Sequence, residues 1–315
     1  MKIKQFLIAV CIGTMFAACS SKDDYSNEAE RIPIRINATI AGNLVGTRAV
    51  ENSANLHGTS FVNGESFYID ICYSGTRTTI PSMDENGYVW GSVYNNGSLN
   101  IGENVFYPLD GRAIDVISVF PSNVDASSFI ASDDRFYVQK DQSTDEKYRL
   151  SDYMYAWAEG LVASEAINLT YHHLMSKVII KLNGYEGTAS DYSVTIKQVQ
   201  TRTDLVNQCT KDVAVGETAE EDKDIADIKM GNYAADGVTA IVIPQTISTG
   251  KTLFEVTIGS QTYEYVTNSE ITFQSGHVYT FNLSFNGDEI TTGTIDIAGW
   301  TGKDDSGHIY PGTLQ

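Results

Sequence analysis

Few residues in this sequence have the types and spacing that chemistry requires. His172 and His173 are adjacent, but neighbouring residues of a strand point to opposite faces and would not bind one metal ion together. Acidic residues gather at 220–224 and 304–305 without the ligand order of a Ca²⁺-binding EF-hand loop. Motifs of phosphate-binding loops, zinc proteases and nucleophile elbows do not occur. These patterns predict no enzyme activity, metal or cofactor. A pair of catalytic carboxylates, as in glycosidases, stays open as an alternative, because spacing along the chain does not define the distance between two side chains.

Aromatic residues suggest a second kind of chemistry, the stacking of sugar rings. Trp90, Trp157 and Trp300 occur together with 18 tyrosines, and exposed aromatic side chains could form a platform for a polysaccharide. In proteins built from strands, such side chains more often fill the core. The pattern therefore favours a position of these aromatic side chains in the core. If they are exposed instead, the chain would be a monomeric surface lipoprotein that binds glycans, and this is kept as the alternative function.

The first residues resemble an export signal that ends at a cysteine. A basic start precedes an apolar run at 6–16, and Ala17 and Ala18 supply the small residues that a signal peptidase requires. The run is too short to span a bilayer, which needs roughly 20 residues. Cys19 follows directly, so the segment resembles the lipobox of bacterial lipoproteins, whose cysteine is acylated. An ordinary signal with an incidental cysteine is the alternative.

A short tether and one strand come next. Residues 20–28 are polar and charged and predict a solvated spacer. Within it, Lys22-Asp23-Asp24 resembles the signal that sends lipoproteins of the Bacteroidota to the outer face of the outer membrane. From residue 32 to residue 40, apolar side chains then alternate with mostly polar ones, which predicts a strand with one apolar face. Pro33 lacks an amide hydrogen and favours an edge or the beginning of that strand.

The whole chain is acidic and contains few cysteines. Its 315 residues are 42% hydrophobic and carry a formal net charge of −19. Such a surface argues against nucleic acid and anionic lipid headgroups as partners, because both bind basic patches. Beyond Cys11 and Cys19, only Cys72 and Cys209 occur. These two lie far apart in the chain, so buried thiols are favoured over a disulfide.

Short strands separated by turns predict an all-β fold. Asn-Gly and Asp-Gly pairs recur from residue 63 to residue 287 and supply the positive φ that tight turns need. Residues 113–121 are apolar on both faces for much of their length and predict a central strand, whereas residues 278–285 alternate with one apolar face. The length of the chain suggests two domains, with an expected boundary at 163–166.

Several motifs stand in an order that one family shares. They are Thr47-Arg48-Ala49 after the first strand, Tyr107-Pro108, Val119-Phe120-Pro121, Asp152-Tyr153-Met154-Tyr155-Ala156, a strand with a His and SKVIIKL at 169–182, GHVYTFNL at 276–283, and Gly299-Trp300. Each motif alone is weak. Together they resemble the fimbrillin family, the type V pilins and related Mfa-like lipoproteins of Bacteroidota, over nearly the whole chain.

The resemblance implies two tandem transthyretin-like β-sandwich domains after a lipoprotein signal peptide. The expected parts are a signal peptide at 1–18, an acidic tether at 19–31, an N-terminal sandwich at 32–164 and a C-terminal sandwich at 165–315. The protein would be a fimbrial structural or adhesive subunit. Its expected location is the cell surface, as an outer-membrane lipoprotein or within a fimbrium.

The resemblance also implies a route of assembly. An arginine-specific protease would cut between Arg48 and Ala49 and so free the first strand from its groove. The side chains expected in that groove are Ile32, Ile34, Ile36 and Ile40. A strand from another subunit, expected from 294–297 or 308–314, would then fill the groove by β-augmentation. An ordinary surface-loop arginine is the alternative for Arg48.

The implied partners agree with this route. They are other fimbrillin subunits, the outer membrane through lipid on Cys19, and ligands on host or bacterial surfaces. Nucleic acid is not among them.

Overall fold

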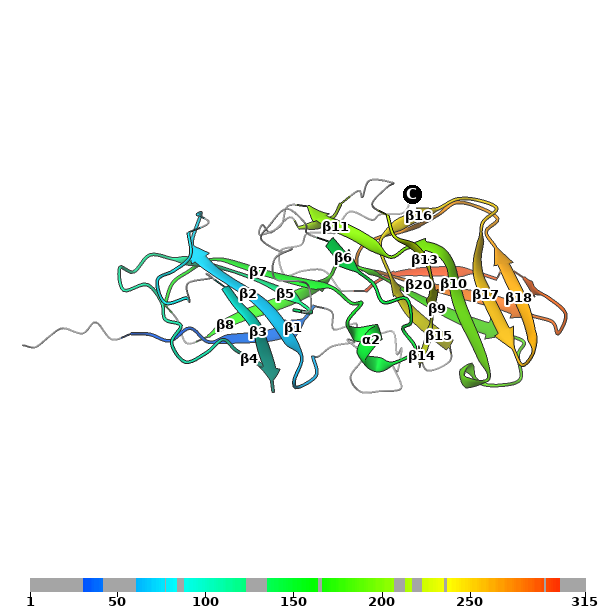
Figure 1. The fold of residues 1–315 in the computed structure, drawn as a ribbon, viewed down its shortest axis with the longest axis horizontal. Helices are drawn as coiled ribbons and strands as arrows, with labels where there is room; N and C mark the ends of the chain where they lie inside the picture. Colours follow the sequence, from blue (N-terminus) through cyan, green and yellow to red (C-terminus); the bar gives the residue numbers. More distant parts are fainter. Residues whose placement is uncertain are drawn as a thin grey trace, which may run out of the picture. The chain divides into compact units, whose positions relative to one another are not determined.

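The computed structural model shows a chain built almost entirely from strands (Figure 1). The residues that it describes are 31–41, 61–76, 78–83, 88–122, 135–163, 166–206, 213–216, 223–234, 237–291 and 293–300. From Ile32 onward they belong to one compact unit. No helix among them is long and apolar enough to cross a membrane. The predicted all-β fold is confirmed.

The first sheet closes on itself in the order β1-β4-β3-β2-β5-β7-β8. Its strands are β1 (Ile36–Ile40), β2 (Ser66–Tyr73), β3 (Tyr88–Asn95), β4 (Ser98–Asn100), β5 (Ile114–Phe120), β7 (Met154–Leu161) and β8 (Ile167–His173). Neighbours along this order are antiparallel. The exception is the pair that closes the sheet, β1 and β8, which run parallel.

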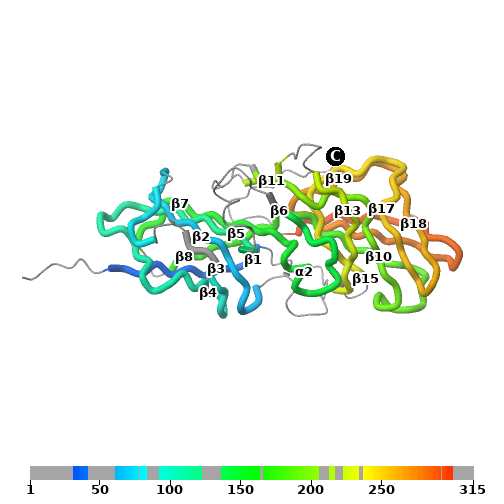
Figure 2. Tube along the Cα trace, viewed as in Figure 1, coloured from blue at the N-terminus to red at the C-terminus, as the bar shows by residue number. Residues whose placement is uncertain are grey.

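Two larger sheets form from later parts of the chain. One has the order β14-β15-β9-β20-β21, with β22 also paired to β20, and the other the order β13-β10-β17-β18. Their strands are β9 (Ser176–Asn183), β10 (Tyr192–Gln200), β13 (Ile225–Lys229), β14 (Gly231–Ala234), β15 (Gly237–Val242), β17 (Thr252–Ile258), β18 (Gln261–Val266), β20 (His277–Phe285), β21 (Ile290–Thr291) and β22 (Ile295–Gly299). Figure 2 follows the same path as a tube.

Smaller elements complete the described part. They are the strands β6 (Arg135–Tyr137), β11 (Arg202–Val206), β12 (Ala214–Val215), β16 (Gln245–Ile247) and β19 (Ile271–Phe273), the helix α2 (Asp145–Arg149) and the 3₁₀ turn η1 (Ala189–Asp191). Strand β11 lies between β12 and β6, and β16 pairs with β19.

Strand β5 separates two hydrophobic clusters. Ile114 and Val116 belong to the cluster that also contains β1, whereas Ile117 and Val119 belong to the cluster of the later sheets. All seven residues of β5 are buried, and the strand pairs with β2 on one side and β7 on the other. Because side chains alternate along a strand, one strand can serve two cores. The predicted central strand is confirmed.

Buried polar groups of β5 are satisfied by nearby strands and turns. The Asp115 carboxylate, whose residue is 5% exposed, accepts hydrogen bonds from the backbone N–H groups of Gly75 at 2.9 Å and Gly160 at 2.8 Å. Ser118 donates to the Tyr68 carbonyl at 2.7 Å and accepts from the Tyr171 hydroxyl at 2.6 Å. A buried polar group without a partner costs folding free energy, so these bonds make the sequence compatible with a buried strand.

Turn chemistry agrees with the sequence at the β3–β4 hairpin. Asn96 has φ 47° and Gly97 has φ 97°, which are the two positive values that a tight two-residue hairpin turn requires. The boundary between two domains at residue 164 stays a prediction, as does the transthyretin-like arrangement. In the structure, β8 follows that position in sequence but pairs with β1 and β7 of the first sheet.

Burial of Tyr153 predicts an alkaline limit to stability. This residue is 4% exposed, its hydroxyl donates to the Tyr137 carbonyl at 3.2 Å, and burial raises its pKa from 10.0 to about 12. The neutral phenol is therefore favoured in the folded state, and its contribution is complete below pH 10 and lost as pH rises through about 12. Two pH units correspond to about 2 to 3 kcal/mol.

The test compares the free energy of unfolding of the wild-type chain and Tyr153→Phe from pH 8 to pH 12. We expect the difference between the two proteins to shrink above pH 10. A difference that stays constant across this range would show that Tyr153 ionises as readily in the folded chain as in the unfolded one.

Candidate functional site

The candidate site is the place that β1 occupies in the first sheet. Strand β1 pairs in parallel with β8, from Ile36 opposite Ile167 to Ile40 opposite Tyr171. On its other side it pairs with β4. The backbone continues these contacts beyond the strand, because Ile34 N–H donates to the Val105 carbonyl at 2.9 Å. Strand β1 is thus enclosed between two neighbours although it is the first strand of the described chain.

One face of β1 supplies core side chains. Ile34, Ile36, Ala38 and Ile40 are 3%, 1%, 2% and 7% exposed. Their cluster also contains the aromatic rings of Phe61, Phe67, Tyr94, Phe120 and Tyr171, and Phe61 packs edge-on against Phe67 with ring centroids 4.8 Å apart. Full burial of each isoleucine contributes about 1.5–3 kcal/mol. The alternation predicted for this strand is confirmed, and Pro33 lies just ahead of it, bridged to Phe106.

The other face of β1 carries polar contacts. Asn37 donates through Nδ2 to Asn168 Oδ1 at 2.9 Å and accepts from Ser98 Oγ at 3.1 Å. The Thr39 hydroxyl donates to the Leu169 carbonyl at 3.3 Å. These bonds reach both neighbouring strands. If β1 left, backbone groups of β4 and β8 would lose their partners and an apolar trough would be exposed, the two properties that a replacing strand satisfies.

Other predicted site residues have different outcomes. Ile32 is 43% exposed and lies ahead of β1, so the structure does not bury it with Ile34, Ile36 and Ile40. Cys19, Arg48 and Ala49 lie outside the described residues, and the lipid attachment and the cut stay predictions. The donor candidate at 308–314 also lies outside them.

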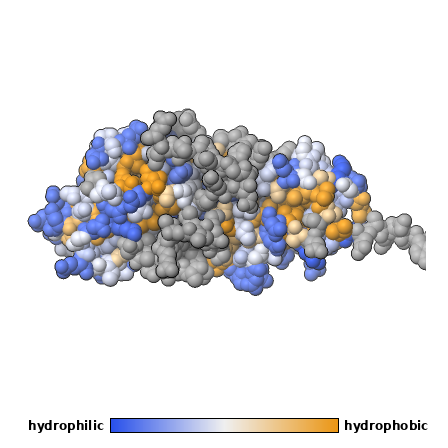
Figure 3. Space-filling model, turned by 180° about the vertical axis from the view of Figure 1, so that it is seen from behind, coloured by the Kyte–Doolittle hydropathy of each residue, from blue (hydrophilic) through white to orange (hydrophobic). Residues whose placement is uncertain are grey.

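The donor candidate at 294–297 lies mostly in β22, an edge strand. Strand β22 pairs with β20, where Ile295 lies opposite Phe281 and Ile297 opposite Tyr279. Ile297 is 36% exposed, and Ile295 is partly buried and packs against the hydrophobic cluster of the later sheets. Figure 3, drawn from the opposite side to Figure 1, shows exposed apolar residues in groups interrupted by hydrophilic ones.

A buried polar pair under an indole ring was not predicted from the sequence. His173 Nδ1 and Asp152 Oδ1 lie 2.7 Å apart, and both side chains are fully buried. The Trp300 indole stacks on the His173 ring, with centroids 3.8 Å apart and planes 5° from parallel. The backbone N–H of Trp300 donates to the Gly276 carbonyl at 2.7 Å. The residues belong to motifs noted in the sequence, but no local pattern indicates that positions so far apart would meet.

A histidine held by a carboxylate is also the arrangement of a general base. In the described part of the chain, the buried His173 Nε2 atom has no hydrogen-bond partner. Within the same residues, no group of three or more His, Cys, Asp or Glu side chains is placed to hold a metal ion. The contacts that the structure shows for the pair are those of packing, because the Trp300 indole covers the His173 ring and is itself 7% exposed.

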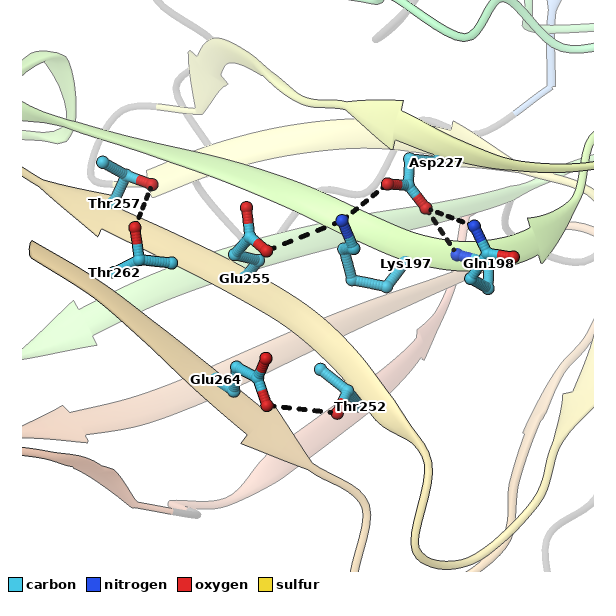
Figure 4. A network of polar contacts seen from close by, with 8 residues as sticks. All are labelled: Lys197, Gln198, Asp227, Thr252, Glu255, Thr257, Thr262 and Glu264. Carbon is cyan, nitrogen blue, oxygen red and sulfur yellow. Dashed lines mark hydrogen bonds and ion pairs between the residues drawn. The ribbon is translucent and has the colours of Figure 1, made fainter.

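A second polar network lies on the sheet β13-β10-β17-β18 (Figure 4). Lys197 Nζ lies 2.6 Å from Asp227 Oδ2 and 3.5 Å from Glu255 Oε2. The hydrogen bond with Asp227 raises the pKa of Lys197 above its usual value. Asp227 also accepts from the backbone N–H of Gln198 at 2.9 Å, where β10 is irregular and Gln198 has φ 49°. These bonds hold the irregular part of β10 in place. The ion pairs are partly exposed, so they add little to the free energy of unfolding.

Solved structures of other proteins share this fold, among them the following two. A candidate cell adhesion protein from Bacteroides uniformis has a TM-score of 0.58 at 17% identity, covering 86% of this chain and 99% of that one. One from Bacteroides ovatus has a TM-score of 0.57 at 20% identity, covering 87% of this chain and 100% of that one. At these identities the likeness shows the fold alone.

The family is shown by the sequence itself. Residues 47–300 match the family model described as fimbrillin-like. This match covers most of the chain, so the chain belongs to the fimbrillin-like family, and the resemblance seen in its motifs is confirmed. No curated protein matches the sequence.

The Trp300 stack generates a stability prediction. Trp300 is 7% exposed, and removing a large buried aromatic side chain leaves a cavity, so we expect Trp300→Ala to lower the free energy of unfolding by about 3–5 kcal/mol. The matched control is Ile297→Ala on the same segment, where the side chain is 36% exposed and the expected loss is below about 1 kcal/mol. Denaturant unfolding measures both. Equal losses would show that β22 is held by its backbone pairing and not by the indole.

Proposed function

We propose that this chain is a structural or adhesive subunit of a fimbrium. It is exported to the cell surface as a lipoprotein anchored through Cys19 and cut between Arg48 and Ala49. It then joins other fimbrillin subunits by donor-strand exchange. Membership of the fimbrillin-like family supports the fimbrial role. The position of β1 supports the route of assembly.

One observation carries this proposal. Strand β1 is internal to a closed sheet and is also the first strand of the described chain. A single cut after it would therefore end the covalent connection between β1 and every other strand that the structure describes. The vacated place would offer unpaired backbone on β4 and β8 and the apolar positions of three isoleucines. Both requirements of β-augmentation would then be present in one groove.

Cleavage at Arg48 is tested by brief digestion of the chain from Ser20 onward with an arginine-specific protease. We expect a denaturing gel to show that the segment ending at Arg48 has been cut from the chain, followed by higher oligomers on gel filtration. Arg48→Ala should reduce oligomer formation at least about tenfold, because the connection to β1 stays intact. Arg31→Ala, on the other side of β1, is the control and should assemble normally.

Two outcomes would contradict the proposal. Oligomers that form equally well from Arg48→Ala would show that assembly does not need this cut. A protease-resistant monomer that binds polysaccharide in an affinity gel would favour the alternative glycan-binding function.

The lipid anchor has its own test. In a bacterial host that processes lipoproteins, the wild-type chain should incorporate a labelled fatty acid, and Cys19→Ala should lose the label completely, because the thiol is the acylated group. Cys11→Ala, within the apolar run, is the control and should keep the label. Equal labelling of Cys19→Ala would show that Cys19 is not the acylated residue, and a wild-type chain without label would show that the segment is an ordinary export signal.

A further inference from the structure

The contacts of β1 determine how the subunit would respond to a cut at Arg48. We propose that β1 stays bound in the first sheet after cleavage, so that the groove opens only when another strand displaces it. The inference rests on the proposed function and deepens it, because it separates cleavage from opening. A cut subunit would then be a two-chain complex that is closed but exchangeable.

Backbone bonds on both sides of β1 connect it to parts of the chain that a cut would leave intact. Towards β8, Ile167 N–H donates to the Arg35 carbonyl and Ala41 N–H donates to the Tyr171 carbonyl, each at 2.8 Å. On the opposite side, Ala38 N–H donates to the Gly97 carbonyl at 2.9 Å. All these partners come after Arg48 in the sequence. Cleavage therefore removes a covalent link but none of these bonds.

The side chains give the same result. Ile34, Ile36, Ala38 and Ile40 are buried in the hydrophobic cluster that contains β1. The other members of this cluster lie between Phe61 and Tyr171, so after a cut they remain with the body, the part of the chain that follows Arg48. A cut only changes an intramolecular contact into one between two chains, which removes the high effective concentration that the linker provides. Dissociation still requires these contacts and both rows of backbone bonds to be lost together. Spontaneous release should therefore be slow.

A competing strand avoids this barrier because it can form its own bonds while β1 leaves. The amino-terminal end of the segment offers an accessible starting point, since the Ile32 side chain is 43% exposed and Pro33 has no amide hydrogen to donate. An incoming strand would replace β1 progressively from such an end. Release should then depend on the concentration of the competitor, which is the signature of displacement.

Chain order adds a consequence for anchoring. Cys19 and β1 lie on the same side of Arg48, so a lipid on Cys19 would remain with the strand and not with the body. A cut subunit whose β1 stays bound would still be attached to the membrane through this non-covalent contact. Displacement of β1 would release the body from the membrane and occupy its groove in one event.

The experiment uses the chain from Ser20 onward, with a site for a sequence-specific endoprotease inserted after Arg48 and a fluorophore at the amino terminus. After complete cutting, gel filtration in native buffer should show the label eluting with the body for hours, and in guanidinium chloride the two should separate. Excess unlabelled peptide of residues 31–48 should raise the rate of label release in proportion to its concentration. A label that leaves as soon as the chain is cut, or a release rate independent of peptide, would overturn the proposal.

Two variants at isoleucines of the same segment test the cause. Ile36→Ala removes a side chain that is 1% exposed and should raise the release rate by about 30-fold or more. Ile32→Ala removes one that is 43% exposed and should change it by less than about twofold. Equal rates in the two variants would contradict retention by the buried face. The peptide measurement needs only the wild-type segment, so it decides the question even if Ile36→Ala does not fold.

The inserted site separates this proposal from the proposed function. If an arginine-specific protease did not cut at Arg48, the proposed maturation would fail, while retention would still be decided with the inserted site. If Arg48 were cut and oligomers formed but the label left at once, retention alone would fail.

Discussion

Closure of the first sheet depends on the parallel pairing of β1 with β8. Every other neighbouring pair in that sheet is antiparallel. The closing pair joins segments far apart in sequence, as the hydrogen bond between Asn37 and Asn168, 131 positions apart, shows. Contacts of such separation are formed at a high cost in chain entropy. Burial of one alternating face of β1 offsets this cost, so the hydrophobic pattern of a short segment supports the whole sheet.

Strand β5 is another single strand on which a large part of the structure depends, because it provides side chains to two hydrophobic clusters. A polar residue on either face of such a strand must be satisfied within the protein. Asp115 and Ser118 meet this requirement through bonds to neighbouring strands and turns. A change that displaced the backbone of β5 would therefore disturb both clusters, whereas a change on the polar face of β1 would act first on that strand and its neighbours.

Local patterns predicted the parts of this structure that local chemistry determines. The alternation along residues 32–40 indicated a strand with one buried face, and Asn96-Gly97 indicated a turn. The pattern extended the buried face to Ile32, which is 43% exposed, because alternation does not show where pairing begins. Two long-range contacts could not be predicted, the pairing of β1 with β8 and the stacking of Trp300 on His173. In each case, the sequence around one partner contains no feature that identifies the other. The family came from the order of several weak motifs, which is information about the whole chain and not about any single site.

The stacked indole also fixes the end of β22. Trp300 follows this strand directly and is buried, its ring lies on that of His173 in β8, and its backbone N–H donates to the Gly276 carbonyl. Strand β22 is therefore held by backbone pairing with β20 along its length and by the indole at its end. If β22 separated from β20, the indole would have to withdraw from the His173 ring at the same time, so the strand and Trp300 would leave as one unit.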